Sequence, residues 1–375
     1  MYHSSQPASS SAGRPLGLTI TSKPGLKGSL GLADVDVAII CALPVETDSM
    51  IAVLDQKYND PVNVDNYLHL TGGIIKNSKV AILRLTNPGQ ARGAHSTETL
   101  AKVFPNAQLF ILAGICGGVG FRRGEDYSKQ HVYLGDVIIS TSVQRFLHSA
   151  TDMDHGLGLN KPAPGQERLL SADSLLWNKL NYCMQGDNIS NFCEKVHENL
   201  KSVVKARADG KFDRWNSKPT ADRPNLNDRL YNSDYIHLHY EECPDACCEI
   251  GTKKACERAK RDSCETTKCD VSKLQRVSPE SSRDPEVYWG PYGSEDIVIR
   301  SSAERDRLFN EGILAVDTEG HGVWQVASDR RRNIIIIKGV SDYADSHKNK
   351  AWQSYASMTA ACTAKAFIQS FHNGK

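Results

Sequence analysis

Four stretches of the chain place glycine or acidic residues directly after a run of apolar residues. Glu46 follows "VAIICALPV", residues 114–118 end "LFILAGICGG", Glu319 follows "ILAVDT", and Asp342 ends "IIIIKGVSD". The ends of strands in an open α/β sheet converge on a crevice where ligands bind. After any single strand, such a residue more often marks a tight turn or a helix cap. The four places together favour a small-molecule site with carboxylates available for hydrogen bonding and proton transfer.

Six of the eleven cysteines lie between residues 243 and 269, with the spacing C-x3-C-C-x7-C-x7-C-x4-C. Two of their pairs have close to the short spacing of structural zinc ligands. These pairs are Cys243/Cys247 and Cys264/Cys269. A structural zinc site in this segment is therefore one hypothesis, and disulfides and free thiols are the alternatives, between which the cell compartment decides.

Two histidines and two further cysteines also bear on the chemistry. His237 and His239 alternate in "DYIHLHY" and are expected on one face of a strand, where a packed or solvated pair is favoured over a role as zinc ligands. Cys41 and Cys116 lie beside the expected crevice, but neither has a histidine near it in the sequence pattern of a cysteine nucleophile. Both are interpreted as small buried residues.

Length and composition limit the class of protein. The 375 residues, 24% of them charged and 40% hydrophobic, fit one large domain with an insertion, or two domains. Lys and Arg number 45 against 44 Asp and Glu, and this net charge of +1 disfavours binding to nucleic acid or to an anionic membrane. The apolar runs are far shorter than the roughly 20 residues that span a bilayer. Residues 1–33 lack a secretory pattern, which predicts a disordered leader and a cytoplasmic protein.

The elements that must position the acidic residues alternate between strands and helices. Residues 35–41 form a short β-branched apolar run that predicts a strand buried on both faces, and Pro44 is placed to begin the helix that follows. A second helix is expected over residues 91–104. Further strands are expected over residues 67–75, 79–86, 107–118 and 134–143. This alternation favours an α/β domain over a β-sandwich.

The second half of the chain indicates that this α/β domain is divided by an insertion. From about residue 160 to 285 the sequence becomes charged and polar, with helices expected over residues 171–182 and 191–206. The α/β pattern then resumes and closes with an Ala-rich helix over residues 351–371. Its strands are expected over residues 296–300, 313–317 and 333–340.

In these segments the chain resembles the purine and uridine phosphorylase (nucleoside phosphorylase I) superfamily. The resemblance is closest to fungal nucleoside-phosphorylase-like domains of immune-receptor-like proteins, with a nucleosidase-type active site. It rests on "VAIICALPVETDSMIAVLD", "LFILAGICGGVG", "GDVIIS", "AERDRLFNEGILAVDTEGHGVW" and "IIIIKGVSDYADSHKNKAWQSYASMTAA". The implied fold is a three-layer α/β sandwich with a central mixed twisted sheet over residues 34–373, which contains the helical, Cys-rich insertion at about 160–285.

The resemblance implies that the protein cleaves the N-glycosidic bond between a ribose and a purine. The transition state has an electron-poor, oxocarbenium-like ribose, so a catalyst must assist the base, hold the sugar hydroxyls and place a nucleophile. Asp342 aligns with the aspartate that protonates or hydrogen-bonds N7 of the purine. Glu319 aligns with the glutamate that accepts hydrogen bonds from the ribose. Glu46 aligns with the nucleosidase glutamate that deprotonates the attacking water.

The expected substrate pocket departs from the family pattern at several places. Thr318 stands where the family usually has a methionine beneath the sugar, and Val298 stands where related nucleosidases have an aromatic residue beneath the base. Base recognition is expected from the segment of Asp296, Val298 and Ile299, with Asp296 accepting from an exocyclic amine. A stacking aromatic must then come from elsewhere. The candidates are Tyr235, Trp289 and Tyr292.

The nucleophile decides the class of reaction. The positions of the phosphate-binding arginine and serine of bacterial phosphorylases align with Leu112 and Ile115, neither of which can bind an anion through its side chain. Water is therefore favoured. A phosphate site remains as the alternative, because backbone N–H groups around Gly114 and Ile115 could cradle an anion, and Arg92 and Arg145 lie near expected strand ends.

The sequence thus predicts a purine nucleosidase, an N-ribosyl hydrolase acting on a purine ribonucleoside or a nucleotide such as ATP. A phosphate-dependent purine nucleoside phosphorylase is the first alternative, and a non-catalytic nucleoside-binding or storage protein on the same fold is the second. No cofactor is expected for catalysis. The resemblance also implies a homo-oligomer, whereas neither nucleic acid nor a membrane is an expected partner.

Overall fold

A computed structural model describes eleven segments of the chain, and every structural statement below refers to these residues. They are residues 34–58, 62–65, 68–119, 132–145, 168–169, 175–212, 220–224, 228–241, 255–277, 283–348 and 350–371. The expected leader, residues 1–33, lies outside them. None of the helices within these segments is long and apolar enough to cross a membrane.

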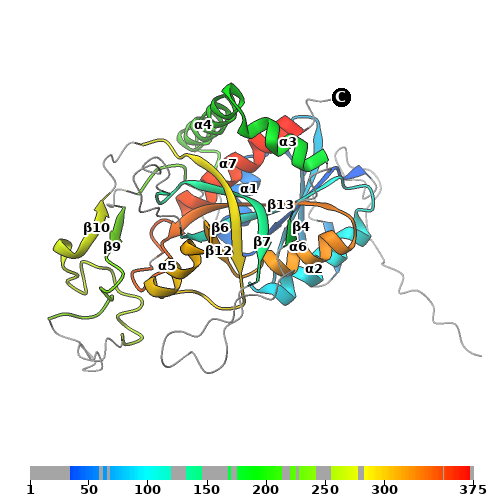
Figure 1. The fold of residues 1–375 in the computed structure, drawn as a ribbon. Helices are drawn as coiled ribbons and strands as arrows, with labels where there is room; N and C mark the ends of the chain where they lie inside the picture. Colours follow the sequence, from blue (N-terminus) through cyan, green and yellow to red (C-terminus); the bar gives the residue numbers. More distant parts are fainter. Residues whose placement is uncertain are drawn as a thin grey trace, which may run out of the picture.

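A single mixed sheet forms the centre of the described structure (Figure 1). Its main path has the strand order β12-β11-β7-β13-β6-β1-β5-β4-β2, with β3 beside β4 and β8 beside β7. The strands are β1 Val37–Cys41, β2 Gln56–Lys57, β3 Val62–Asp65, β4 Leu68–Ile75, β5 Ser78–Arg84, β6 Leu109–Gly118, β7 Val137–Gln144, β8 Arg168–Leu169, β11 Val287–Ser294, β12 Ala315–Asp317 and β13 Asn333–Asp342. β1, β5, β6 and β13 run parallel, whereas β7 runs antiparallel to β13.

Helices cover both faces of this sheet and complete a three-layer α/β sandwich. The helices are α1 Pro44–Ala52, α2 Gln90–Val103, α3 Leu175–Met184, α4 Asp187–Ala208, α5 Ser302–Asn310, α6 Gly320–Asp329 and α7 Gln353–Phe371. α1 and α4 pack against α7 on one face, and α2 packs against α6 on the other (Figure 1). The expected fold class, with its central mixed sheet, is confirmed.

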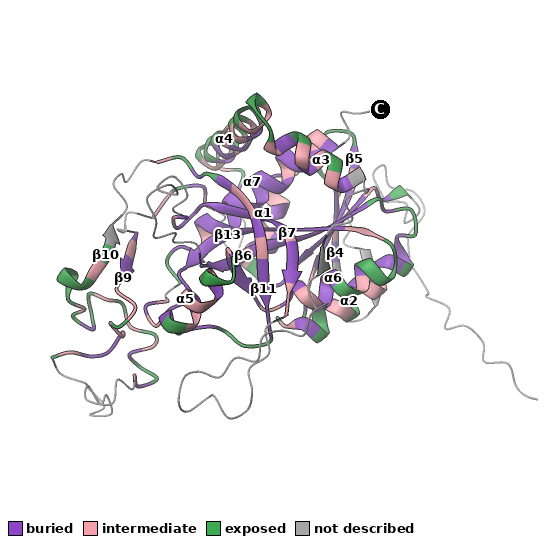
Figure 2. Cartoon of the chain, in the orientation of Figure 1, coloured by how far each residue is buried: buried purple, intermediate pink, exposed green. Residues whose placement is uncertain are grey.

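The apolar core lies between the sheet and these helices. All five residues of β1 are buried, and nine of the ten residues of β13 are buried (Figure 2). Strands buried on both faces need side chains that fill space without polar groups, which explains their Ile- and Val-rich sequences. The chain turns at the carboxyl ends of these strands, and polar groups carried there can meet a ligand.

The β6 strand brings the acidic segments together. β12 pairs with β6 as well as with β11, and Val316 lies opposite Gly117 in that pairing. On the other side of β6, Asp342 of β13 is also paired with Gly117. A Cβ atom at Gly117 would lie 3.1 Å from the Val316 side chain and 3.2 Å from Oδ1 of Asp342. The absence of a side chain at this residue therefore lets the ends of β12 and β13 converge.

The strand predicted over residues 296–300 is wrong, because those residues lie after a strand rather than in one. The strand is β11, and Ile297 and Val298 are exposed. The sequence of β11, "VYWGPYGS", contains two glycines and a proline, which hide a strand pattern. Its pairing with β7 shifts register between Gly290 and Pro291, and such an irregularity is where a sheet tolerates proline.

The expected insertion at about residues 160–285 supplies two kinds of structure. Its helices α3 and α4 pack with each other, and α4 also packs against α7. Its later part contains a separate two-stranded sheet of β9 Arg229–Tyr231 and β10 Leu274–Val277, which lies at the left edge of the molecule in Figure 1. His237 and His239 are both buried but do not lie in a strand, so the strand expected there is wrong.

Candidate active site

A cavity of about 260 Å³ opens where β1, β6, β12 and β13 end. Seven of the residues predicted for the site line it. They are Glu46, Ile115, Val298, Ile299, Thr318, Glu319 and Asp342. Asp317 also lines the cavity, and so do two cationic residues, Arg300 and Lys348. The strand ends therefore gather four carboxylates around one small cavity.

Glu46 is held at the entry to α1, which begins with Pro44 after β1. Its Oε2 accepts hydrogen bonds from the backbone N–H groups of Ala42, at 2.7 Å, and Leu43, at 2.8 Å. Its Oε1 accepts a third from Ile115 N–H, at 2.8 Å. These bonds fix the carboxylate between the ends of β1 and β6.

The environment of Glu46 makes it suited to exchanging a proton near neutral pH. Burial raises the pKa of Glu46 to about 7, with a contribution from nearby Glu319, against the opposing effects of Lys338 and the backbone N–H donors. A carboxyl whose pKa lies near the working pH is the form that general acid–base catalysis favours.

Gly114 does not line the cavity, and the structure places it behind Glu46. A Cβ atom at this residue would lie 2.2 Å from Oε1 of Glu46. The glycine therefore provides the space in which the carboxylate lies against β6, and this is its role in the described structure rather than contact with a ligand.

Lys338 is the functional residue that the sequence analysis missed. It lies within the buried strand β13, opposite Gly114 of β6, and its side chain is 1% exposed. Its Nζ lies 2.8 Å from Oδ2 of Asp317 and 2.8 Å from Oε2 of Glu319. Burial alone lowers the pKa of Lys338. The negative charges of Asp317, Glu319 and Glu46 raise this pKa by more than burial lowers it, so the ammonium stays charged. A lysine inside the apolar run "IIIIKGV" was the signal that could have identified it.

Lys338 also sets the charge of Glu319, which ends the turn between β12 and α6. Burial alone raises the pKa of Glu319. The charge and the hydrogen bond of Lys338 lower this pKa by more, so the pKa of Glu319 lies below its usual value. Oε1 of Glu319 accepts from Gly89 N–H at 3.3 Å and from the hydroxyl of Thr318. Glu319 is thus a fixed negative charge, whereas Glu46 titrates near neutral pH.

Asp342 lies at the end of β13 and is buried. Its Oδ2 accepts from the Ser341 hydroxyl at 2.8 Å, and its Oδ1 accepts from Ala344 N–H at 3.0 Å. Lys348 Nζ lies 3.0 Å from Oδ2. The nearby Asp345 is buried and pairs with Arg305 at 3.2 Å.

The residues expected to recognise the base are only partly brought together. Val298 and Ile299 line the cavity, but Asp296 does not. Asp296 instead accepts a hydrogen bond from Gln90 N–H at 2.7 Å, at the start of α2, so its carboxylate caps that helix.

The three candidates for a stacking aromatic do not line the cavity. The Tyr292 hydroxyl donates to the Ile138 carbonyl at 2.7 Å within the core, and Trp289 packs against Phe192 with ring centroids 6.0 Å apart. Tyr235 stacks on Tyr231 in the insertion. The prediction that one of them stacks on the base is therefore wrong for this structure, in which aliphatic side chains cover that side of the cavity.

The arginines expected as alternative phosphate ligands also lie away from the cavity. Arg92 is exposed on α2, and Arg145 pairs with Glu295 at 3.1 Å. Neither lines the cavity. The cations that do line it are Arg300, which is exposed, and Lys348, which is half-buried.

Two of the four cysteines expected as zinc ligands lie among the described residues. Cys264 and Cys269 lie close to each other and to His237, in a group that could hold a metal ion. Cys243 and Cys247 lie outside the described residues. This group belongs to the insertion and does not line the cavity.

Two proteins of known name are similar to the chain in sequence. It is 25% identical over 347 residues to a nucleotide-binding leucine-rich repeat (NLR)-like protein of Hyaloscypha variabilis, with 91% of this chain and 30% of that protein covered. It is 31% identical over 78 residues to the ATP nucleosidase Cap17 of Escherichia coli, with 20% of this chain and 15% of that protein covered. The chain thus spans less than a third of the length of either relative. No protein-family model matches it.

Solved structures share the fold along nearly the whole chain. One is the 5'-methylthioadenosine/S-adenosylhomocysteine nucleosidase of Neisseria meningitidis, with a TM-score of 0.50 and 15% identity, covering 89% of this chain and 98% of that one. Another is such a nucleosidase from Colwellia psychrerythraea in complex with adenine, with a TM-score of 0.51 and 13% identity, covering 90% and 96%. The chain therefore has the nucleoside phosphorylase and nucleosidase fold.

Proposed function

We propose that the protein hydrolyses the N-glycosidic bond of a purine ribonucleoside or ribonucleotide and releases the free base. The observation that carries this proposal is the pair of unlike carboxyl groups in one cavity. The pKa of Glu46 is raised to about 7, mainly by burial, whereas Glu319 stays charged because the effect of Lys338 outweighs that of burial. Two carboxyl groups whose environments drive their pKa values apart are a pattern that divides proton transfer from charge stabilisation.

Each carboxylate has a role that its contacts support. Glu46 takes a proton from water as the water oxygen attacks C1' of the ribose. Glu319 accepts hydrogen bonds from the ribose hydroxyls, and these bonds strengthen as the sugar becomes cationic. Asp342, in its carboxylic acid form, donates a proton to N7 of the departing purine, where negative charge develops. Lys338 holds Glu319 and Asp317 in place, and its charge limits the rise in the pKa of Glu46.

Two observations support a phosphorylated substrate as one member of the substrate class. Arg300 and Lys348 line the cavity and provide cationic groups for phosphate oxygens. The matched relative from Escherichia coli is called an ATP nucleosidase. The chemistry of the carboxylates is the same for a nucleoside and a nucleotide, so both belong in the test.

Phosphorolysis is the weaker alternative, because the arginines expected to bind phosphate do not line the cavity. A non-catalytic nucleoside-binding role is weaker still, since a protein that only binds has no physical need for a buried carboxyl that titrates near neutral pH. The homo-oligomer and the cytoplasmic location stay predictions.

The test is base release from adenosine, inosine, guanosine, methylthioadenosine, AMP and ATP, each with and without inorganic phosphate. We expect at least one purine substrate to release its base at the same rate in both buffers. Release only with phosphate would establish a phosphorylase. Binding of a nucleoside in calorimetry without any base release would establish the non-catalytic alternative.

A further inference from the structure

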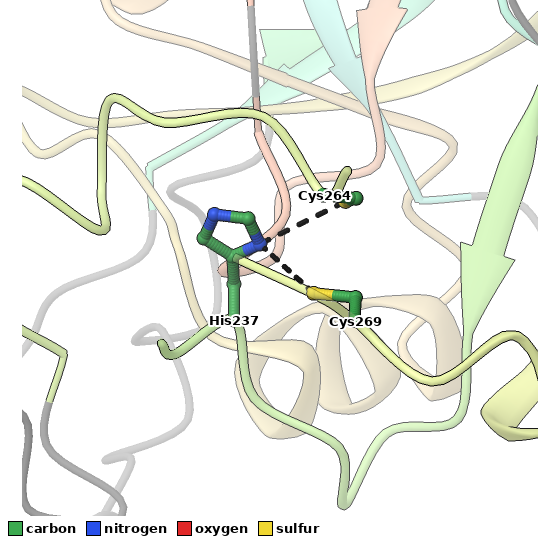
Figure 3. Close-up of side chains that lie close together, drawn as sticks. All are labelled: His237, Cys264 and Cys269. Carbon is green, nitrogen blue, oxygen red and sulfur yellow. Dashed lines mark hydrogen bonds between the residues drawn. The ribbon is translucent and has the colours of Figure 1, made fainter. Parts of the chain in front are cut away.

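A second group of reactive side chains lies in the insertion, outside the cavity. His237, Cys264 and Cys269 point toward one another, as Figure 3 shows. Nδ1 of His237 lies 3.3 Å from Sγ of Cys269 and 3.7 Å from Sγ of Cys264. The three ligand atoms lie within 4.8 Å of one another. Neither the proposed function nor the fold of the sheet requires this group.

The His237 ring is oriented by a hydrogen bond on its other side. Its Nε2 lies 3.0 Å from the backbone carbonyl oxygen of Asp262, which only accepts, so Nε2 carries the proton. Nδ1 of the neutral ring then has one lone pair, and this lone pair faces two sulfur atoms. One lone pair can accept from one thiol only, whereas a single cation between the three atoms can bind all of them. A backbone carbonyl behind the ring is also the usual outer partner of a metal-bound histidine.

The distances agree with a tetrahedral zinc centre. Zinc–sulfur bonds of about 2.3 Å and zinc–nitrogen bonds of about 2.0–2.1 Å, at a tetrahedral angle, place sulfur and nitrogen about 3.6 Å apart. The two observed distances, 3.3 and 3.7 Å, lie on either side of this value. The Thr267 hydroxyl, 3.3 Å from Sγ of Cys269, can donate to a thiolate there.

A buried histidine from another part of the chain lies beside the group. The ring of His347 stacks on Tyr231, with centroids 4.1 Å apart, and stands edge-on to His237 at 5.3 Å. It is one of the groups that interact with the thiol of Cys269. Its Nε2 is buried and forms no hydrogen bond within the described segments. A buried imidazole nitrogen without a partner is costly unless something binds it.

We propose that His237, Cys264 and Cys269 bind a Zn²⁺ ion, with Nε2 of His347 as the fourth ligand. Two thiolates and two imidazoles are a closed ligand set that suits structural zinc. The proposal replaces the expected cysteine-only pairs with two histidines that are far apart in the sequence.

Such a zinc centre would join the insertion to the segment that carries Asp342. His347 follows Asp342 by five residues, and His237 N–H donates to the Ser346 hydroxyl at 3.0 Å. Asp345 of the same segment pairs with the buried Arg305 of α5, and Arg305 also bonds the Ser233 hydroxyl at 3.1 Å. The ion would therefore act as a structural link, and its detection does not depend on the proposed hydrolysis.

The first experiment measures zinc per folded chain by elemental analysis after purification and dialysis against zinc-free buffer. The test variant is Cys264→Ser/Cys269→Ser, and the control is Cys193→Ser, a half-buried cysteine of α4 outside the group. We expect the double variant to contain one zinc fewer per chain than the wild type, and the control to match the wild type. Equal zinc content in the wild type and the double variant would overturn the proposal.

A second experiment uses the wild-type chain alone, so a folding defect of the variant cannot decide the matter. Replacement of the metal by Co²⁺ should give a thiolate-to-cobalt charge-transfer band, and mass spectrometry should find Cys264 and Cys269 without a bond between them. A Cys264–Cys269 disulfide in the wild type would contradict the proposal.

The fourth ligand is tested separately with His347→Ala. Loss of this ligand should weaken zinc binding by more than the roughly 10–100-fold that removal of an outer partner costs. Wild-type zinc affinity in His347→Ala would remove this residue from the ligand set.

Discussion

The cavity at the strand ends and the group of His237, Cys264, Cys269 and His347 both bury polar side chains, but they differ in how charge is balanced. In the cavity, Lys338 is a permanent cation that lies 2.8 Å from each of two carboxylates. In the group of the insertion, the side chains are imidazoles and thiols, which can remain neutral without an ion. The cavity is therefore charged and arranged by the chain itself, whereas the other group is proposed to reach its full set of bonds with a metal.

Because of this difference, we expect substitutions in the cavity to affect the reaction rate or the stability, and substitutions in the other group to affect metal binding. Fixed charges at a site provide preorganised electrostatics, so their removal should change the rate of a reaction or leave a buried charge uncompensated. The ligands of a metal contribute through the ion, so their removal should change metal content first. Substitutions of the charged residues in the cavity test the first expectation.

The largest effect is expected from Asp342→Asn, which removes the carboxyl group proposed to protonate the purine but keeps a similar shape. We expect base release to fall by about 10²–10⁴-fold, the usual contribution of a positioned acid or base. Because the Asp342 side chain is 3% exposed and paired with Lys348, urea unfolding of the variant is measured beside its rate. A wild-type rate in a folded variant would contradict the assigned role.

Lys338→Met should be the most destabilising single change in the cavity. It leaves Asp317 and Glu319 buried without their cation, and removal of one partner of a buried ion pair costs about 3–5 kcal/mol. Lys365→Met is the matched control, because Lys365 pairs with the exposed Asp55, and loss of such a surface pair costs about 0–1 kcal/mol. Urea unfolding measures both. Equal losses in the two variants would show that Lys338 does not balance the buried charge.

The raised pKa of Glu46 predicts a pH-dependent stability. Burial raises this pKa from 4.5 to about 7, so the folded state binds the proton more tightly than the unfolded state. The stability that this proton contributes is present below about pH 4.5 and is lost as the pH rises through about 7. At 1.36 kcal/mol per pKa unit, the loss amounts to roughly 3 kcal/mol.

Glu46→Gln provides the reference for that effect, since glutamine does not titrate. Urea unfolding at about pH 4.5 and pH 8 should show the wild type losing stability relative to Glu46→Gln as the pH rises. A constant difference between the two proteins across this range would mean that Glu46 has an ordinary pKa.

Gly114→Ala should destabilise the protein less than Lys338→Met. The new methyl group would overlap Oε1 of Glu46, and such overpacking typically costs about 1–3 kcal/mol. Because Glu46 must move to relieve the contact, base release should fall further than the loss of stability explains. Thermal unfolding and the rate of base release, measured on the same preparation, separate the two. A wild-type rate would show that the position of Glu46 is not critical.

The sequence was sufficient to predict the fold class and to indicate the three acidic residues now found in one cavity. Glu46, Glu319 and Asp342 follow apolar strands directly, and a sheet places such strand ends together. Lys338 was missed because a lysine within an apolar run was treated as part of the strand, although burial of its ammonium requires partners.

Other features depend on contacts that no local pattern contains. The strand β11 was missed because Gly290 and Pro291 interrupt its apolar pattern, and a register shift in its pairing with β7 accommodates them. His347 meets His237 and Cys269 only through the packing of the insertion against the end of β13. Spacing between cysteines indicated a metal site, but it could not indicate histidines about 30 and 80 residues away.

The central claim is that Glu46 activates water in a cavity whose charges are fixed by Lys338. The most direct test compares base release by the wild type, Glu46→Gln and the control Glu98→Gln, whose carboxylate lies on the surface of α2, in phosphate-free buffer with the best purine substrate. The account predicts an active wild type, an active control and a loss of about 10²–10⁴-fold in Glu46→Gln. A wild type that releases base only after phosphate is added, or a folded Glu46→Gln that retains the wild-type rate, would contradict it.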